Sequence, residues 1–209
     1  SGVMENLIAD RLDKPFPHMI FRNFYNEKEL ELIWEELDFY TKEDKLFEAK
    51  EFGGIVNSTN SKAIWLDKVY KDQYRKLSNI LTVNRKIFDE EVLNAFASVH
   101  DCCSIAVHCN YDVTKVRYYH NGDYYKPHTD KTVQFLAFSY FFREPKRFTG
   151  GELIFPKYDY KFSCDNNSLI MMPGWVEHGV SEVKIDNSDY FDGYGRYAIT
   201  SFFSNKEKE

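Results

Sequence analysis

Hydrophobic positions in the first hundred residues recur mainly at helical spacing. Asn26 is a suitable N-cap, and Glu27 and Glu29 then fall in the first turn, where acidic side chains favour the helix dipole. Apolar residues follow every three or four positions from Leu30 to Leu37, which predicts an amphipathic helix over residues 27–39. Helical spacing predicts two further helices, at residues 66–78 and 84–99, and a Pro-punctuated turn leads into a short predicted strand at residues 15–21.

The pattern changes from about residue 105. Short apolar or alternating runs predict strands near residues 114–119, 133–142, 151–155, 168–172, 179–185 and 197–203. Turn-forming residues separate these runs, as in a sandwich, barrel or jelly roll. We therefore predict an α+β fold, in which a C-terminal double-stranded β-helix (a jelly roll) is supported by N-terminal helices. Since no flexible linker interrupts the chain, residues 1–209 are expected to form one domain, with helical support and substrate-side loops in 1–104 and the jelly-roll core in 105–204.

Composition narrows the class of protein. Aromatic residues make up 17% of the chain, which favours β structure. A net charge of -6 argues against a general nucleic-acid binder, and no apolar run approaches the ~18 residues of a membrane span. The first residues show no secretory signal, and the four cysteines form no CxxC motif. We therefore expect a cytoplasmic protein with reduced thiols and with neither nucleic-acid nor membrane partners.

One short segment carries candidate metal ligands. His128 and Asp130 are two residues apart, so on an extended chain their side chains share one face. His178 follows a tight turn at Pro173-Gly174 and is the best third ligand. Two imidazoles and one carboxylate leave open positions on an octahedral Fe(II). Because the chain contains six histidines, this pattern alone is weak evidence.

The surrounding motifs make the pattern specific. The chain resembles the prolyl-hydroxylase-like branch of the 2-oxoglutarate and iron(II)-dependent oxygenases in four ordered segments. These are a Tyr-x-x-Gly-x-x-Tyr-x-x-His-x-Asp motif at 119–130, a Gly-Gly-Glu-Leu-Ile-Phe-Pro strand at 150–156, a strand, turn and histidine at 168–178, and an Arg-Tyr-Ala-Ile-Thr strand at 196–200.

The resemblance implies roles for individual residues. His128, Asp130 and His178 would bind Fe(II) and form the catalytic centre. Arg196 would pair with the distal carboxylate of 2-oxoglutarate, as a guanidinium does in bidentate geometry. Tyr119 would add a hydrogen bond to this cosubstrate, and Thr200, on the same strand face as Arg196, would assist. Dioxygen is the other cosubstrate, and ascorbate is a candidate reductant.

One departure from the family pattern leaves an alternative open. The basic residue usually lies about ten residues after the second histidine, whereas Arg196 lies eighteen after His178. The intervening segment is rich in turn formers and predicts a longer loop, which costs only ~0.6 kcal/mol per doubling of length. Lys184 is therefore the weaker candidate for the basic residue that binds the distal carboxylate of 2-oxoglutarate.

The resemblance favours hydroxylation of a prolyl residue in a peptide or protein, with succinate and CO2 as coproducts. The alternatives are a hydroxylase of a free amino acid or other small molecule, a non-catalytic jelly-roll binding module, and a zinc hydrolase, although no HExxH motif is present. The segment 47–67 shows no clear helix or strand pattern and is a candidate substrate-covering loop. The sequence does not indicate an oligomeric state.

Overall fold

The first long helix begins where its capping residue predicts. A computed structural model describes residues 7–48, 59–130, 132–186 and 189–206, and its helix α1 spans Glu27–Lys42. The Asn26 side chain accepts a hydrogen bond from the Glu29 backbone N–H, and the Glu29 carboxylate accepts one from the Asn26 N–H, both at 2.9 Å. This reciprocal capping box satisfies two backbone donors that the helix itself cannot pair.

We expect the Asn26→Ala variant to lose about 1 kcal/mol of the free energy of unfolding, because its cap acceptor disappears. Urea titration of the wild type and the variant measures the change. Glu31→Ala is the matched control, since Glu31 is exposed on α1 and takes no part in the cap. Equal stability of Asn26→Ala and wild type would show that the capping box contributes nothing.

The other predicted helices are interrupted. The remaining helical segments are α2 (Leu66–Val69), η3 (Asp72–Leu77), α3 (Asn79–Val83), η4 (Asn84–Phe88), α4 (Glu90–Ala97), η5 (Asp101–His108) and η6 (Pro156–Tyr158). Tyr70 and Lys71 leave the helical region (ψ 88° and 146°), which ends the helix predicted for 66–78 after one turn, and Asp72 then adopts a left-handed backbone (φ 53°). Asp89 is extended and caps α4, so it divides the helix predicted for 84–99. Apolar periodicity continues across these breaks because both pieces pack on the same core.

Eight strands form the larger sheet, in the spatial order β1-β2-β12-β8-β15-β6-β5-β3. Their bounds are β1 (Ile8–Leu12), β2 (His18–Arg22), β3 (Phe47–Glu48), β5 (Lys62–Trp65), β6 (Tyr111–Tyr119), β8 (Phe135–Phe141), β12 (Ser168–Pro173) and β15 (Arg196–Ser204). Four of the eight strands come from residues before 105, so this part of the chain contains more strand than its hydrophobic spacing predicts. Residue 105, where the sequence predicts that the jelly-roll core begins, lies within η5.

Five strands form the smaller sheet, in the order β11-β10-β13-β7-β4. Their bounds are β4 (Thr59–Asn60), β7 (Tyr124–His128), β10 (Leu153–Phe155), β11 (Tyr160–Phe162) and β13 (His178–Val180). The strand predicted for 179–185 is divided, because its second part, β14 (Lys184–Ile185), pairs with β9 (Phe148–Thr149) in a separate ribbon.

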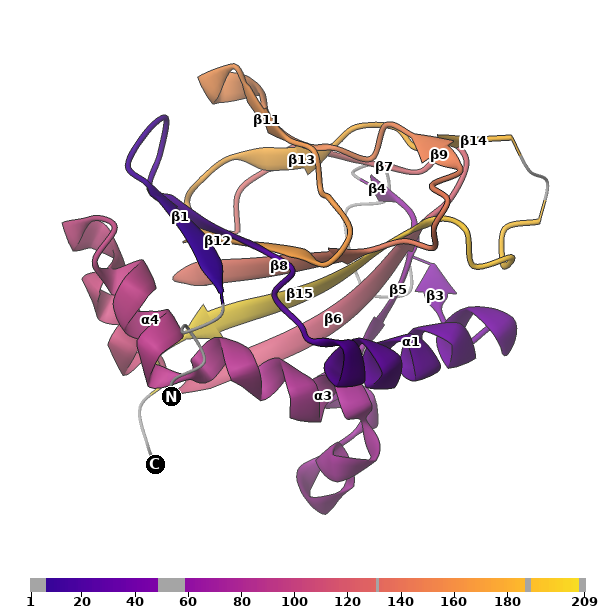
Figure 1. The fold of residues 1–209 in the computed structure, drawn as a ribbon, viewed down its shortest axis with the longest axis horizontal. Coiled ribbons are helices and arrows are strands. Elements are labelled where there is room, and N and C mark those ends of the chain that lie inside the picture. The colour runs from indigo at the N-terminus through magenta and orange to yellow at the C-terminus, as the bar shows by residue number, and fades with distance from the viewer. Residues whose placement is uncertain (1–6, 49–58, 131, 187–188, 207–209) are drawn as a thin grey trace.

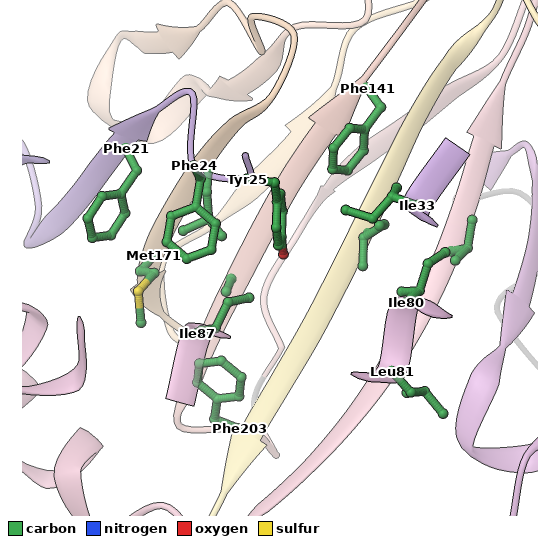
Figure 2. Packing of buried hydrophobic residues seen from close by; sticks show 14 of the residues in the cluster. Phe21, Phe24, Tyr25, Ile33, Ile80, Leu81, Ile87, Phe141, Met171 and Phe203 are labelled. Atoms are coloured by element: carbon green, nitrogen blue, oxygen red, sulfur yellow. The ribbon is translucent and has the colours of Figure 1, made fainter. Parts of the chain in front are cut away.

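The larger sheet is buried on both faces. Helices α1, α3 and α4 cover one face, and the smaller sheet lies over the other (Figure 1). Alternate residues of β15 therefore enter different cores: Tyr197 and Ile199 pack towards the helices, and Ala198 and Phe202 pack between the sheets. Figure 2 shows the helix-side core, in which Phe24, Tyr25, Ile33, Ile80 and Phe141 point from the helices, β8 and the segment after β2 into one apolar layer. The predicted jelly roll with a helical layer is confirmed.

Within the described residues, no helix combines the length and the apolar character that a membrane crossing requires.

Candidate active site

Two histidines meet across neighbouring strands of the smaller sheet. His178 on β13 is directly opposite His128 on β7, and their ring centroids are 4.5 Å apart. Gly179 makes this close pairing possible. A Cβ at this position would lie 2.7 Å from the carbonyl oxygen of Tyr125 and 2.8 Å from the nitrogen of Pro127, closer than side chains tolerate.

Asp130 completes a cluster of three candidate ligands. Its Oδ2 lies 3.3 Å from Nε2 of His178 and 3.7 Å from Nε2 of His128. The backbone N–H of Asp130 donates to the carbonyl of Gly174 at 3.0 Å, which fixes the loop after β7 against the turn before β13. No other group of three His, Cys, Asp or Glu side chains with metal-binding spacing occurs in the described ranges. The structure therefore brings together the three residues that the sequence singles out.

Backbone carbonyls orient both imidazole rings. Nδ1 of His128 lies 2.9 Å from the carbonyl oxygen of Lys126, and Nδ1 of His178 lies 2.9 Å from that of Val176. Because a carbonyl only accepts, each Nδ1 carries the proton and each Nε2 presents its lone pair to Asp130. The Oδ2 atom of Asp130 is then buried without a hydrogen-bond donor, although it faces two ring nitrogens. A cation at this point would satisfy all three atoms.

Electrostatics keep the cluster in its ligating form. Burial and the neighbouring His178 lower the pKa of His128 to about 4, so this imidazole is neutral at pH 7. Neutral imidazole and carboxylate are the forms that bind metal. The side chains of His128 and Asp130 remain 26% and 23% exposed, which leaves one side of the cluster open to further ligands. Two histidines and one carboxylate with open positions suit non-haem Fe(II).

A cavity extends from the cluster into the space between the two sheets. It has a volume of about 450 Å³ including its open mouth. Alternate residues of β15, Arg196, Ala198 and Thr200, line the wall formed by the larger sheet, and Tyr119 of β6 lies opposite Arg196. Tyr119, Arg196 and Thr200 therefore lie where the sequence places them, on one face beside the histidines.

Arg196 is buried at one end of this cavity with unused hydrogen-bond donors. It is 1% exposed, and its guanidinium lies 4.8 Å and 4.5 Å from the ring centroids of Tyr119 and Tyr140. Nη2 donates to Sγ of Cys164 at 3.5 Å, but Nε and Nη1 have no partner among the described residues. A buried guanidinium with two nitrogens that lack an acceptor is costly. A carboxylate in the cavity would offer acceptors to this guanidinium, so the site fits a carboxylate ligand.

Lys184, the alternative residue for binding 2-oxoglutarate, does not reach the cavity. Lys184 is exposed on β14 and does not line the cavity, so the geometry favours Arg196. Asp123 and Lys126, which lie close to His128 in the sequence, also lie outside it. Asp123 is buried and accepts a hydrogen bond from the Tyr190 hydroxyl at 2.6 Å.

The other four histidines lie outside the cavity. His18 and His120 are buried and hydrogen-bonded, whereas His100 and His108 are exposed. Of the candidate covering segment at 47–67, residues 49–58 lie outside the described part of the chain. Its described end contributes β4, which pairs with β7 beside the histidines.

Sequence reasoning missed three polar cavity residues, Lys115, Arg117 and Tyr140. Lys115 and Arg117 alternate with Tyr119 along β6, so period-two spacing places all three on one face. Tyr140 lies on β8 two positions from Phe138, and its hydroxyl has no partner in the described structure. The alternation of residues along β6 and β8 was therefore the signal that could have identified them.

Comparison with known proteins agrees with this site. Residues 114–204 match the model of the 2OG-Fe(II) oxygenase superfamily, whose members use Fe(II), 2-oxoglutarate and dioxygen. The match includes the histidine–aspartate cluster and Arg196. No curated protein sequence matches the chain.

Several solved structures share the fold. A prolyl-4-hydroxylase from Pseudomonas putida has a TM-score of 0.58 and 15% identity, with 91% of this chain and 93% of that chain covered. A Trichoplax adhaerens prolyl hydroxylase in complex with a hypoxia-inducible-factor peptide has a TM-score of 0.58 and 12% identity, covering 89% and 82%. The viral collagen prolyl hydroxylase of Paramecium bursaria Chlorella virus-1 has a TM-score of 0.51 and 17% identity, covering 89% and 94%. Residues 114–204 therefore match the 2OG-Fe(II) oxygenase superfamily, and the chain has the fold of the prolyl 4-hydroxylases, as its motifs predict.

Proposed function

We propose that this enzyme hydroxylates a C–H bond of a prolyl residue in a peptide or protein, producing succinate and CO2 from 2-oxoglutarate. The observation that carries the oxygenase chemistry is the convergence of a His-Asp-His cluster and a buried, partly unpaired Arg196 in one cavity. The fold shared with prolyl hydroxylases, one of them in complex with a peptide, supports the prolyl substrate.

Each residue has a defined task in this proposal. His128, Asp130 and His178 hold the iron, and Arg196 binds the distal carboxylate of 2-oxoglutarate. When bound, iron and 2-oxoglutarate supply the oxidising chemistry. Apolar side chains such as Phe138, Leu153 and Val180 line the same cavity and exclude water around the reacting groups.

Tyr140 is placed to hydrogen-bond the same carboxylate. Its hydroxyl is buried without a partner, and its ring lies 4.5 Å from the Arg196 guanidinium. Burial holds the pKa of Tyr140 well above its usual range, so the hydroxyl stays protonated and can donate. Tyr119, on the other side of Arg196, faces the cavity in the same way.

We expect Tyr140→Phe to weaken 2-oxoglutarate binding by about 10- to 100-fold, because a hydrogen bond to a charged group contributes ~1.5–3 kcal/mol. The unliganded variant should be at least as stable as wild type, since the lost hydroxyl has no partner. Calorimetric titration and thermal melting measure the two effects. Unchanged affinity together with lower stability would assign Tyr140 a purely structural role.

The proposed reaction is tested with proline-containing peptides, Fe(II), 2-oxoglutarate and air. The expected result is a peptide product heavier by one oxygen atom, formed in equal amount with succinate, and absent without 2-oxoglutarate. Free L-proline and other amino acids form a second arm, because hydroxylation of a small molecule is the alternative substrate class. Hydroxylation of amino acids alone would reject the peptide substrate but retain the oxygenase.

A further inference from the structure

Two basic side chains of the cavity take no part in the iron and 2-oxoglutarate contacts assigned above. Lys115 and Arg117 on β6 are each 8% exposed and line the cavity wall. Lys115 forms no hydrogen bond or ion pair with a described residue, and its Nζ lies 4.8 Å and 5.1 Å from the ring centroids of Trp65 and Phe202. Arg117 donates from Nη1 to Oγ of Ser61 at 2.6 Å and pairs with no carboxylate in the described ranges.

Both side chains lie on the side of the cavity near the metal ligands. The Arg117 guanidinium lies 5.1 Å from the ring centroid of Tyr125, and that ring stacks on His128 with centroids 4.1 Å apart. Lys115 lies close enough to Asp130 for the carboxylate to influence its pKa, although burial lowers the pKa of Lys115 well below its usual value. A group bound by these cations would therefore lie next to the iron.

The strand register places Lys115 far from Arg196, which lies at the end of the cavity where the distal carboxylate of 2-oxoglutarate would bind. Arg196 is opposite Tyr119, whereas Lys115 is opposite Thr200, four residues further along β15. At ~3.4 Å per residue this is about 14 Å along the strand. Arg117 is flanked on its two neighbouring strands by Ala63 and Ala198, whose short side chains leave room for its guanidinium. One dicarboxylate held by Arg196 and the metal does not also use Lys115.

Charge balance points the same way. In the loaded site the charges of Fe(II) and 2-oxoglutarate cancel, and Arg196 offsets Asp130. The charge of Arg117, and that of Lys115 in its protonated form, then have no counterpart among the described residues lining the cavity. Like charges in a site shielded from water repel strongly, so a binding partner that brings a negative charge is favoured there.

We propose that Lys115 and Arg117 bind a carboxylate of the substrate beside the hydroxylated carbon, so that this enzyme selects acidic substrates. This assignment rests on the oxygenase function proposed above. The carboxylate belongs either to an acidic residue next to the target proline or to the target amino acid itself, and the probes below distinguish these two sources.

The test uses matched probes that differ only in the charge. Blocked tripeptides with aspartate on either side of proline are compared with their asparagine counterparts, and L-proline is compared with L-prolinamide. Affinity is measured by titration calorimetry on anaerobic protein loaded with Fe(II) and 2-oxoglutarate, and probe-dependent succinate formation is measured in air. At least one acidic probe should bind at least tenfold more tightly than its neutral partner. The pair that shows this preference identifies the source of the carboxylate.

Substitutions then assign the preference to the two cations. Lys115→Met and Arg117→Gln should each reduce the acidic-over-neutral ratio to less than threefold, while Lys115→Arg and Arg117→Lys should largely retain it. Lys157→Met is the control, since Lys157 is exposed and lies outside the cavity. Thermal melting of each variant checks folding, and the charge-retaining variants keep the test decisive if a neutral substitution destabilises the protein.

Three results would overturn the assignment: equal binding of acidic and neutral probes, undetectable binding of all acidic probes, or a preference that persists in both neutral variants. Failure of the proposed function looks different. In that case the loaded protein would show no visible absorption from an iron–2-oxoglutarate complex before any probe is added. An absorbing complex without acidic selectivity would reject only the role of Lys115 and Arg117.

Discussion

The His128→Ala variant is expected to show no visible charge-transfer band when Fe(II) and 2-oxoglutarate are added without oxygen, and no turnover in air. Loss of one of three protein ligands should weaken iron binding by more than ~100-fold, because substitutions of residues behind the ligands already cost 10- to 100-fold. The wild type should develop the band only when both additions are made. Anaerobic absorption spectroscopy and iron analysis of the desalted protein measure the two effects.

A substitution of Tyr125, on the same strand as His128, distinguishes loss of a metal ligand from loss of structure. Tyr125 stacks on the His128 ring but offers no metal ligand, so Tyr125→Phe keeps the stacking and should keep the band. Circular dichroism verifies that both variants retain the sheet. A folded, iron-loaded wild type without the band would contradict the oxygenase function and favour a binding module or a zinc enzyme.

Removal of the buried guanidinium should have the second largest effect. Arg196→Ala is expected to raise the 2-oxoglutarate concentration required for half-maximal rate by about 30-fold or more, since loss of one partner of a buried, hydrogen-bonded charge pair costs 2–5 kcal/mol. Iron binding should persist, because Arg196 contributes no ligand. Kinetics over a range of 2-oxoglutarate concentrations, with iron content measured in parallel, give both quantities.

Lys184→Ala is the matched control for Arg196→Ala. Lys184 has the same charge and also lies between His178 and the chain end, but its side chain is exposed on β14. Its substitution should leave the 2-oxoglutarate requirement within about twofold of wild type, as for a surface residue. A large effect of Lys184→Ala together with a small effect of Arg196→Ala would reverse the assignment and assign the carboxylate to Lys184.

The sequence predicted best those features that depend on the spacing of a few neighbouring residues. Asn26 before an acidic turn predicted the start of α1, and the period-two spacing of β15 predicted that Arg196 and Thr200 share a face. The His-x-Asp spacing predicted two neighbouring ligands on one side of the chain. These features depend on local geometry, which sequence spacing records directly.

Other features depended on interactions that spacing does not record. The break after Val69 is made by the backbone of Tyr70 and Lys71, residue types that helices readily accept, so a continuous helix was predicted. The N-terminal strands β1, β3 and β4 are short edge strands whose pairing is decided by their neighbours. Lys115 and Arg117 were overlooked because a charged residue in a strand is usually solvated, and their burial follows only from the second sheet above them.

The two halves of the site belong to different sheets: the iron ligands lie on and beside β7 and β13, and Arg196 lies on β15. A dicarboxylate held at one end by the metal and at the other by Arg196 would therefore act as a removable cross-link between the layers of the sandwich. Iron alone would strengthen only the smaller sheet. The rigidity of the whole jelly roll would then depend on cosubstrate supply, so an enzyme short of 2-oxoglutarate would be easier to pull apart as well as inactive.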